Sequence, residues 1–302
     1  MRAYVGRFAP SPTGPLHYGS LVAAVASYLQ AASQAGTWLV RMDDLDPPRE
    51  QAGASDSILQ ALDIHGFEYP APVYQSNRLD RYTEVLEQLL SSGVAYPCAC
   101  SRKQIHATAS FGRAGAIYPG TCRGGLPPGV TNPLAVRLRT DNQEVQFSDG
   151  LQGPQTCRIE SEIGDFLLRR GDGLISYHLA AVIDDAEQAV TEVVRGTDLL
   201  DSSFPQVFLQ RALGLPQPAY MHIPVVLNAR GQKLSKQTHA APINQEYPVR
   251  NIFKCLLFLE QNPPSSLQSA KLDELWAWAR QHWNPARLAG QRSRPETAIM
   301  MQ

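Results

Sequence analysis

Two short stretches of the sequence carry residue types that can bind and polarise phosphate groups. His17 and Gly19 stand just before an alanine-rich run, and Lys233 and Lys236 lie on either side of a serine in GQKLSKQ. Backbone N–H groups at the start of a helix can hold an anion, an imidazole can donate to a phosphate oxygen, and two ammonium groups can neutralise a triphosphate. Taken singly, each stretch is more simply a surface turn or a solvated charged loop. Their occurrence together favours phosphoryl or nucleotidyl transfer.

Three of the five cysteines form a second group with possible chemistry. Cys98, Cys100 and Cys122 lie in one stretch that is rich in glycine and proline. In a cytosolic chain such a cluster indicates metal binding more readily than a disulfide framework. Three thiolates make an incomplete tetrahedral site, and His106 is the candidate fourth ligand by chemistry. The simpler alternative is three free thiols, and a closed site of four ligands would be structural.

The elements that would position the phosphate-binding residues alternate between strand and helix. TWLVRM at 37–42 has the content of a buried strand, and LVAAVASYLQAAS at 21–33 consists mainly of strong helix formers. A strand at 4–8 and helices near 54–66 and 79–93 continue the pattern. This order predicts an α/β protein with a parallel sheet and right-handed crossovers.

The middle of the chain, about 96–164, has a different composition. It contains more Gly, Pro and Cys, and short strand candidates at 134–139 and 145–149. We interpret it as an insertion between two halves of the sheet. The strand and helix pattern then resumes with DGLISYHLAAVIDD, VTEVVRG, a helix near 204–213 and the strand-like HIPVVLN, and KLSKQ is expected in a loop.

The C-terminal part is expected to be helical. The stretches 248–261 and 271–283 predict two helices, and the tail RSRPETAIMMQ is expected to be partly disordered. We therefore expect one domain over 1–245 and a short helical region over 246–302.

Composition excludes some classes of protein. The chain has 302 residues, of which 43% are hydrophobic and 18% are charged, as is typical of soluble globular proteins. No apolar run reaches the roughly 18 residues of a membrane span, and the N-terminus shows no signal peptide, so we expect a cytoplasmic protein that does not enter a membrane. The net charge of −1 shows no global basic excess, although a local stripe of Lys and Arg can suffice to bind RNA.

The motifs together resemble those of a known family. RFAPSPTGPLHYGS at 7–20, VRMDDLDPPRE at 40–50, VVRGTDLL at 193–200 and KLSKQ at 233–237 are similar to segments of class I aminoacyl-tRNA synthetases of the glutamyl branch. HYGS is similar to the HIGH motif and KLSKQ to the KMSKS loop, with serine and glutamine in place of the last residue of each.

The resemblance implies a Rossmann-type nucleotide-binding sheet that carries the synthetase insertion. It implies catalysis by His17, Gly19, Lys233 and Lys236, with ATP bound near His17, Gly19 and Lys236 and with Mg²⁺ present. The products would be an aminoacyl-adenylate and pyrophosphate.

The resemblance also implies the amino acid. Arg7 and Arg195 each present a planar fork that suits a carboxylate, Tyr177 can donate a hydroxyl, and Asp43 can accept from an ammonium group. Without the family match, Arg195 could equally form a structural salt bridge and Tyr177 could be a half-buried core residue. The positions that match the family's glutamate site are Arg7, Phe8, Ala9, Pro10, Ser11, Asp43, Tyr177 and Arg195. The family usually has Glu where this chain has Asp43, so we expect retained glutamate specificity.

Two features make the chain similar to the short glutamyl-Q synthetases within this family. This group has the pattern CxC followed by YxxxC, which implies one structural Zn²⁺ on Cys98, Cys100, Tyr118 and Cys122, with His106 as the alternative to Tyr118. In addition, fewer than about 65 residues follow the lysine loop, too few for the helical region that grips the anticodon in bacterial glutamyl-tRNA synthetases.

This resemblance implies a specific reaction. The enzyme would activate L-glutamate with ATP without tRNA, then attach it to the queuosine base at the wobble position of tRNA(Asp), acting as a monomer. Three alternatives are a truncated glutamyl-tRNA synthetase that charges a tRNA 3′ end, an inactive paralogue that binds tRNA or a protein, and a nucleotidyltransferase that shares the fold.

Overall fold

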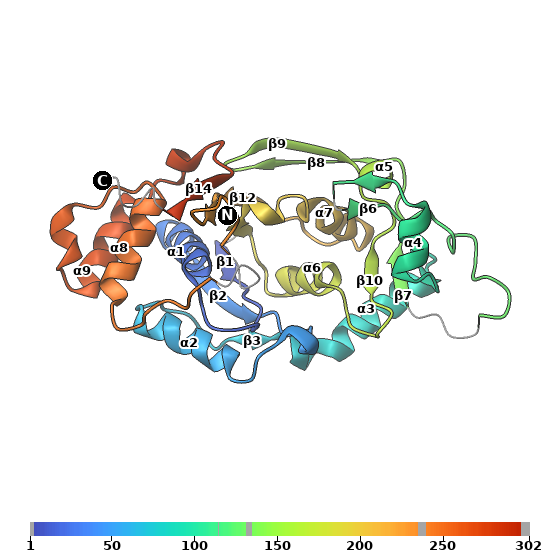
Figure 1. Cartoon of the computed structure of the whole chain (residues 1–302), viewed down its shortest axis with the longest axis horizontal. Coiled ribbons are helices and arrows are strands. Elements are labelled where there is room, and N and C mark those ends of the chain that lie inside the picture. Colours follow the sequence, from blue (N-terminus) through green and yellow to red (C-terminus); the bar gives the residue numbers. More distant parts are fainter. Residues whose placement is uncertain (1–2, 114, 131–134, 235–239, 297–302) are drawn as a thin grey trace.

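The computed structural model describes residues 3–113, 115–130, 135–234 and 240–296. The molecule is elongated (Figure 1), with helices α8 (Pro248–Phe258) and α9 (Leu272–His282) at one end and helix α4 (Arg102–Thr108) at the other. A parallel sheet lies between them. Among the described residues, no helix is both long and apolar enough to cross a membrane.

The first half of the sheet is built from the N-terminal elements. Strands β1 (Val5–Phe8), β2 (Thr37–Met42) and β3 (Val73–Tyr74) pair in parallel, with Val5 opposite Thr37. Helix α1 (Tyr18–Ser33) connects the first two and is buried along most of its length. The strand predicted at 37–42 is confirmed, and the helix predicted from 21 begins three residues earlier because the side chain of His17 caps it.

The second half of the sheet comes from later in the chain. Strands β11 (Glu192–Gly196), β12 (Ala219–Ile223) and β8 (Glu144–Asp149) pair in parallel, and β9 (Gly153–Arg158) pairs antiparallel to β8. The Thr191 N–H, just before β11, donates to the Val5 carbonyl at 2.9 Å, which places β11 beside β1. The predicted α/β class with a parallel sheet is therefore confirmed.

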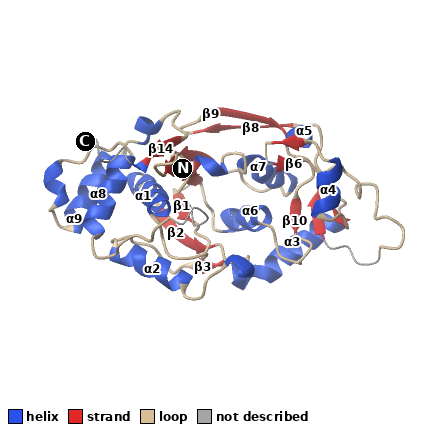
Figure 2. Cartoon of the chain, viewed as in Figure 1, coloured by secondary structure: helices blue, strands red, loops and turns tan. Residues whose placement is uncertain are grey.

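Four further helices accompany this sheet, two from the first half of the sequence and two from the second half. They are α2 (Ala54–Ile64), α3 (Leu79–Ser91), α6 (Tyr177–Glu187) and α7 (Ser203–Ala212), as Figure 2 shows. Helices α2, α3 and α7 lie within a few residues of the ranges predicted for them. Helix α6 lies in the stretch DGLISYHLAAVIDD, where the sequence predicted only that the strand and helix pattern resumes.

A smaller antiparallel sheet lies toward the end opposite α8 and α9. It consists of β4 (Ala95–Cys98), β7 (Ala135–Leu138) and β10 (Leu167–Arg169), with β7 in the middle. The hairpin of β5 (Phe111–Gly112) and β6 (Gly115–Ala116) and the short helix α5 (Ile159–Glu162) lie nearby. This region carries the cysteine cluster.

The C-terminal segment departs from its prediction. The strand-like HIPVVLN divides into the end of β12 and strand β13 (Val225–Leu227), because Pro224 cannot donate to a ladder. Within the tail that was expected to be partly disordered, Ser293–Pro295 form strand β14, which pairs in parallel with β13, and residues 297–302 lie outside the described residues. This pairing depends on a distant partner, and the short polar tail shows no local sign of it.

An aromatic cluster attaches the C-terminal helices to the first half of the sheet. The Trp276 ring on α9 lies 5.0 Å from the Tyr28 ring of α1 and 5.1 Å from the Phe67 ring. Its indole Nε1 donates to the His65 carbonyl at 2.8 Å, so the polar end of this buried side chain is satisfied. The Trp38 ring of β2 also meets Tyr28, at 5.2 Å. Helix α9 therefore packs against the same hydrophobic core as α1 and β2.

We predict that Trp276→Ala lowers the free energy of unfolding by about 3–5 kcal/mol, because it leaves a cavity and an unpaired carbonyl. Trp278→Ala is the matched control on the same helix. The Trp278 ring is partly exposed and stacks on His282 at 4.5 Å, so its loss should cost only about 1 kcal/mol. Urea denaturation of both variants measures the difference, and equal losses would contradict this account of the core.

Candidate functional site

A cavity of about 660 Å³ opens where strands β1 and β11 end. The carboxyl ends of adjacent parallel strands are the usual place for a ligand in an open α/β sheet. The cavity brings together ten of the residues predicted from sequence. They are Arg7, Phe8, Ala9, Pro10, Ser11, His17, Gly19, Tyr177, Arg195 and Lys233.

The start of helix α1 forms one wall of this cavity. His17 is the N-cap residue, and its Nδ1 accepts from the Ser20 N–H at 3.3 Å while its Nε2 lies 3.1 Å from the Ser20 hydroxyl. A Cβ at Gly19 would come within 3.3 Å of the His17 ring and 3.5 Å of the Leu234 carbonyl. A side chain at this position would therefore require the imidazole to move by a few tenths of an ångström, whereas the Leu234 carbonyl would lie at an ordinary contact distance. The positive end of the helix dipole faces the same space.

The predicted lysine loop is described only in part. The Lys233 ammonium pairs with the carboxylate of Asp198, which also lines the cavity. Asp198 lies in the turn that follows β11. Lys236 lies outside the described residues.

Arg195 enters the cavity from β11 and is held by several partners. Its Nη1 donates to the Tyr177 hydroxyl at 3.1 Å, and its Nη2 donates to the Ser203 hydroxyl at 2.7 Å and to the Leu199 carbonyl at 3.2 Å. Its Nε donates to Nε2 of His222 at 3.0 Å. All four partners are neutral in these contacts, so the guanidinium is fixed in place, and no carboxylate of the described residues touches it.

Arg7 is held in the opposite way, by a buried network of charges. Its Nε donates to Asp185 at 3.3 Å, and the same carboxylate oxygen accepts from Arg41 Nη1 at 2.7 Å. Arg41 also donates through Nε to Asp43 at 2.8 Å and lies 3.6 Å from Asp184. These side chains join β1, β2 and α6 at the base of the cavity.

The network gives its carboxylates different acidities. Burial raises the pKa of Asp43 to about 6, although the Arg41 guanidinium beside it acts in the other direction. Burial also acts to raise the pKa of Asp185, but Arg7 and Arg41 outweigh it and hold that pKa below its usual range. Asp43 therefore changes its charge near neutral pH, whereas Asp185 stays ionised.

Asp43 lies in a second cavity of about 810 Å³ rather than in the first. Ser11, Tyr177 and Asp198 line both cavities, so the two adjoin at these residues. The second cavity extends from this junction to Tyr118 and also contains His178, whose pKa burial lowers to about 4. The predicted carboxylate therefore lines the second cavity, which adjoins the first.

The sequence analysis did not single out Arg41, Asp184 or Asp185. The available signal was the pair of adjacent aspartates at the end of the apolar run LAAVI. Asp184 is fully buried and accepts from Gln75, Arg78 and Tyr82 at 2.7 to 3.0 Å. Two buried carboxylates on one helix require cationic partners, but their identity follows only from the tertiary structure.

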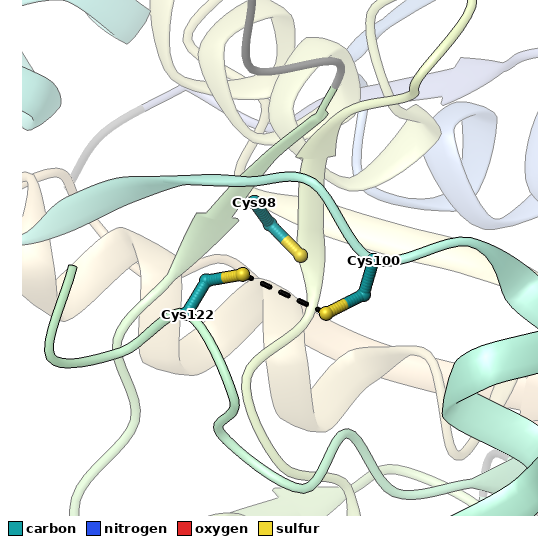
Figure 3. A group of neighbouring side chains, drawn as sticks. All are labelled: Cys98, Cys100 and Cys122. Carbon is teal, nitrogen blue, oxygen red and sulfur yellow. Dashed lines mark hydrogen bonds between the residues drawn. The ribbon is translucent and has the colours of Figure 1, made fainter. Parts of the chain in front are cut away.

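The cysteine cluster forms a separate site in the smaller sheet (Figure 3). The sulfur atoms of Cys98, Cys100 and Cys122 all lie within 4.8 Å of one another and point toward a common space. The Tyr118 hydroxyl lies 3.4 Å from the sulfurs of both Cys98 and Cys100 and accepts from the Cys122 N–H at 2.8 Å. His106 is exposed on α4 and is not part of this group.

The surroundings of the cluster suit a negatively charged set of ligands. Arg137 donates through Nε to the Cys98 sulfur at 3.4 Å, and its guanidinium lies 3.9 Å from the centroid of the Tyr118 ring. A nearby cation favours thiolates. Burial, with hydrogen bonds to the three cysteines, raises the pKa of the Tyr118 hydroxyl, which opposes a phenolate in the absence of a metal ion. The three cysteines could thus hold a metal ion, and tetrahedral Zn²⁺ is the ion that such thiolate sets usually bind.

The chain is similar to proteins of known family. Residues 4–252 match the family model described as tRNA synthetases class I (E and Q), catalytic domain. A glutamyl-Q tRNA(Asp) synthetase from Aromatoleum aromaticum is 50% identical over 282 residues, which cover 93% of this chain and 89% of that protein. Another, from Dechloromonas aromatica, is 51% identical over 283 residues, covering 93% and 94%.

A solved structure shares the fold. The crystal structure of a glutamate tRNA ligase from Elizabethkingia meningosepticum in complex with its amino acid matches with a TM-score of 0.79 and 24% identity, covering 98% of this chain and 68% of that one. The family model spans the cavity residues from Arg7 to Lys233. The chain therefore belongs to the class I tRNA synthetases of the E and Q group.

Proposed function

We propose that this protein activates L-glutamate with ATP in the absence of tRNA and transfers the glutamate to the queuosine base at the wobble position of tRNA(Asp). The observation that carries the proposal is the pair of arginines, Arg7 and Arg195, in the same cavity as the start of helix α1. Two guanidinium groups suit a dicarboxylic amino acid, and the helix start suits the phosphates of ATP. The acceptor is proposed from the similarity to the glutamyl-Q tRNA(Asp) synthetases.

In the proposed binding mode, Arg7 and Arg195 bind the two carboxylates of glutamate. Tyr177 donates its hydroxyl to a carboxylate, and Asp43 accepts from the ammonium group at the junction of the two cavities. Phe8 at the end of β1 and the loop residues Ala9, Pro10 and Ser11 form the wall beside them. The shorter side chain of Asp43, compared with the family's usual Glu, is accommodated because Arg41 fixes its carboxylate at 2.8 Å.

The proposed reaction has two steps. A glutamate carboxylate oxygen forms a bond to the α-phosphorus of ATP, and the bond from that phosphorus to the bridging oxygen breaks to release pyrophosphate. His17, Lys233 and Lys236 stabilise the negative charge that develops, and Gly19 allows the nucleotide to approach. A queuosine hydroxyl then attacks the glutamyl carbonyl, AMP leaves, and the hydroxyl proton passes to solvent. Mg²⁺ bound with ATP would neutralise part of the phosphate charge.

The acceptor can be tested with two preparations of tRNA(Asp), one with queuosine and one with guanosine at the wobble position. We expect labelled glutamate to enter only the queuosine form, and to enter it equally when the terminal CCA has been removed. Incorporation into tRNA(Glu), or loss of incorporation on trimming, would instead identify an enzyme that charges 3′ ends. No incorporation together with no glutamate-dependent pyrophosphate exchange would leave an inactive RNA-binding paralogue. Because tRNA is the proposed partner, the cytoplasm is the proposed place of action.

The role of Asp43 predicts a dependence on pH. Because the pKa of Asp43 is about 6, kcat/KM for glutamate should fall as the pH decreases below that value, where the protonated carboxyl no longer pairs with the ammonium group. Asp43→Asn should lower kcat/KM by about tenfold or more at neutral pH and remove this decline. The neighbouring Asp44→Asn removes the same charge and should keep the profile. A normal profile in Asp43→Asn would contradict the assignment.

We propose that Cys98, Cys100, Tyr118 and Cys122 hold one structural Zn²⁺. The ion would fix the segment between β4 and β7 to the smaller sheet, and it would supply no position for substrate because four protein ligands close the site. The support is the convergence of three sulfurs and one phenolic oxygen in a buried space beside the Arg137 guanidinium. His106, the alternative fourth ligand by chemistry, is exposed on α4 and lies outside this group.

Metal analysis of purified protein should find about one zinc per chain. Cys100→Ser and Cys122→Ser should lose most of the zinc and lower the melting temperature, whereas Cys255→Ala, a buried cysteine in another part of the core, should keep it. Tyr118→Phe should weaken zinc retention against a chelator, and His106→Ala should not. Stoichiometric zinc in both cysteine variants would contradict the proposed site.

A further inference from the structure

Three neighbouring strands place one polar side chain each in a line behind the first cavity. Asp149 ends β8, His222 lies on β12 and Arg195 lies on β11. Arg195 is directly opposite His222 in the parallel pairing, and Asp149 pairs with Tyr220 two residues before it. The line therefore runs across the sheet from a buried carboxylate to the cavity.

The contacts along this line determine which nitrogen of His222 carries the proton. Asp149 Oδ2 lies 2.6 Å from His222 Nδ1, and Arg195 donates through Nε to His222 Nε2 at 3.0 Å. A guanidinium Nε always carries a hydrogen, so His222 Nε2 must offer a lone pair. The imidazole is therefore neutral and protonated on Nδ1, from which it donates to Asp149.

We propose that Asp149 and His222 are positioning residues that set the orientation of Arg195 toward the substrate carboxylate. The proposal rests on the proposed function, in which that carboxylate belongs to glutamate. Neither residue lines the cavity, so neither is expected to touch the substrate. Both side chains are fully buried.

The groups that face His222 act on its pKa in opposite directions, since burial and Arg195 act to lower it while Asp149 and Asp198 act to raise it. Burial lowers its pKa and the Arg195 charge does the same, which outweighs Asp149. The Tyr220 ring stacks on the imidazole at 6.1 Å and 13°, and the Ser203 hydroxyl lies 3.3 Å from Nε2. Asp198 is the remaining charge that acts on it. The imidazole consequently stays neutral and continues to accept from Arg195.

Asp149 is itself fixed from behind. Its Oδ1 accepts from the N–H groups of Leu151 at 3.0 Å, Gln152 at 2.8 Å and His222 at 3.2 Å. Hydrogen bonds from His222 and from these backbone groups hold the pKa of Asp149 below its usual range despite burial. A fixed carboxylate fixes the imidazole, and the imidazole fixes the Nε edge of Arg195. The Nη1 edge, bonded to Tyr177, is then presented to the cavity without further ordering on binding.

Three substitutions separate positioning from general stability. His222→Asn keeps an N–H near Nδ1 for Asp149 but removes the acceptor for Arg195. His222→Gln places an amide oxygen near the Nε2 position and can restore that acceptor. Asp149→Asn preserves shape but can donate to Nδ1, which would move the histidine proton to Nε2, against Arg195. His65→Gln, at a buried histidine in another part of the core, is the control.

Pyrophosphate exchange with the full chain gives the kinetic test. His222→Asn and Asp149→Asn should raise the KM for glutamate by about tenfold or more while changing the KM for ATP by less than about twofold. His222→Gln should recover most of the loss, and His65→Gln should match the wild type. Equal changes in both KM values, or no rescue by His222→Gln, would overturn the positioning role.

A second measurement does not depend on substrate. Long-range ¹H–¹⁵N spectra of the histidine rings should show His222 neutral and protonated on Nδ1 at neutral pH, and protonated on Nε2 in Asp149→Asn. A wild-type His222 protonated on Nε2, or charged, would overturn the proposal. If the wild type shows the expected tautomer but no glutamate-dependent exchange, the proposed function fails while the geometry of the line stands.

Discussion

The buried guanidinium of Arg41 is the contact on which the candidate site depends. It lies between Asp43, Asp184 and Asp185, and Asp185 in turn holds Arg7. Removing one partner of such a buried network leaves an uncompensated charge, which typically costs about 3–5 kcal/mol. The same contacts that join β1, β2 and α6 therefore fix the proposed ammonium-binding carboxylate and one of the two carboxylate-binding arginines.

The two cavity arginines differ in how the fold holds them. Arg7 touches a carboxylate that stays ionised, so part of its charge is already balanced. Arg195 is held by a histidine, a serine hydroxyl, a tyrosine hydroxyl and a carbonyl. Its uncancelled charge makes it the stronger attraction for an anion, and its neutral partners keep the guanidinium from turning toward another acid. A dicarboxylic ligand would thus meet Arg195, whose charge is not balanced by a touching carboxylate of the described residues, and Arg7, whose charge is partly balanced by Asp185.

Sequence reasoning succeeded where the signals were local. The strand at 37–42 and the helix ending at 33 follow from composition and periodicity, and both appear at those bounds. The charge network could not be predicted in this way, because Arg41 and Asp185 are 144 residues apart and only packing brings them together. Strand β14 was missed for the same reason, and the proximity of Tyr118 to the thiols was suggested by family resemblance rather than by spacing.

The central claim is that this cavity selects glutamate and joins it to ATP without RNA. The most direct test is exchange of labelled pyrophosphate into ATP by the purified protein, with glutamate, aspartate or glutamine supplied one at a time and no tRNA present. The account predicts exchange with glutamate at a kcat/KM at least about tenfold above that for aspartate, which is one methylene shorter, and for glutamine, which lacks the second charge. A kcat/KM for aspartate or glutamine equal to that for glutamate would contradict the account, and so would exchange that requires tRNA.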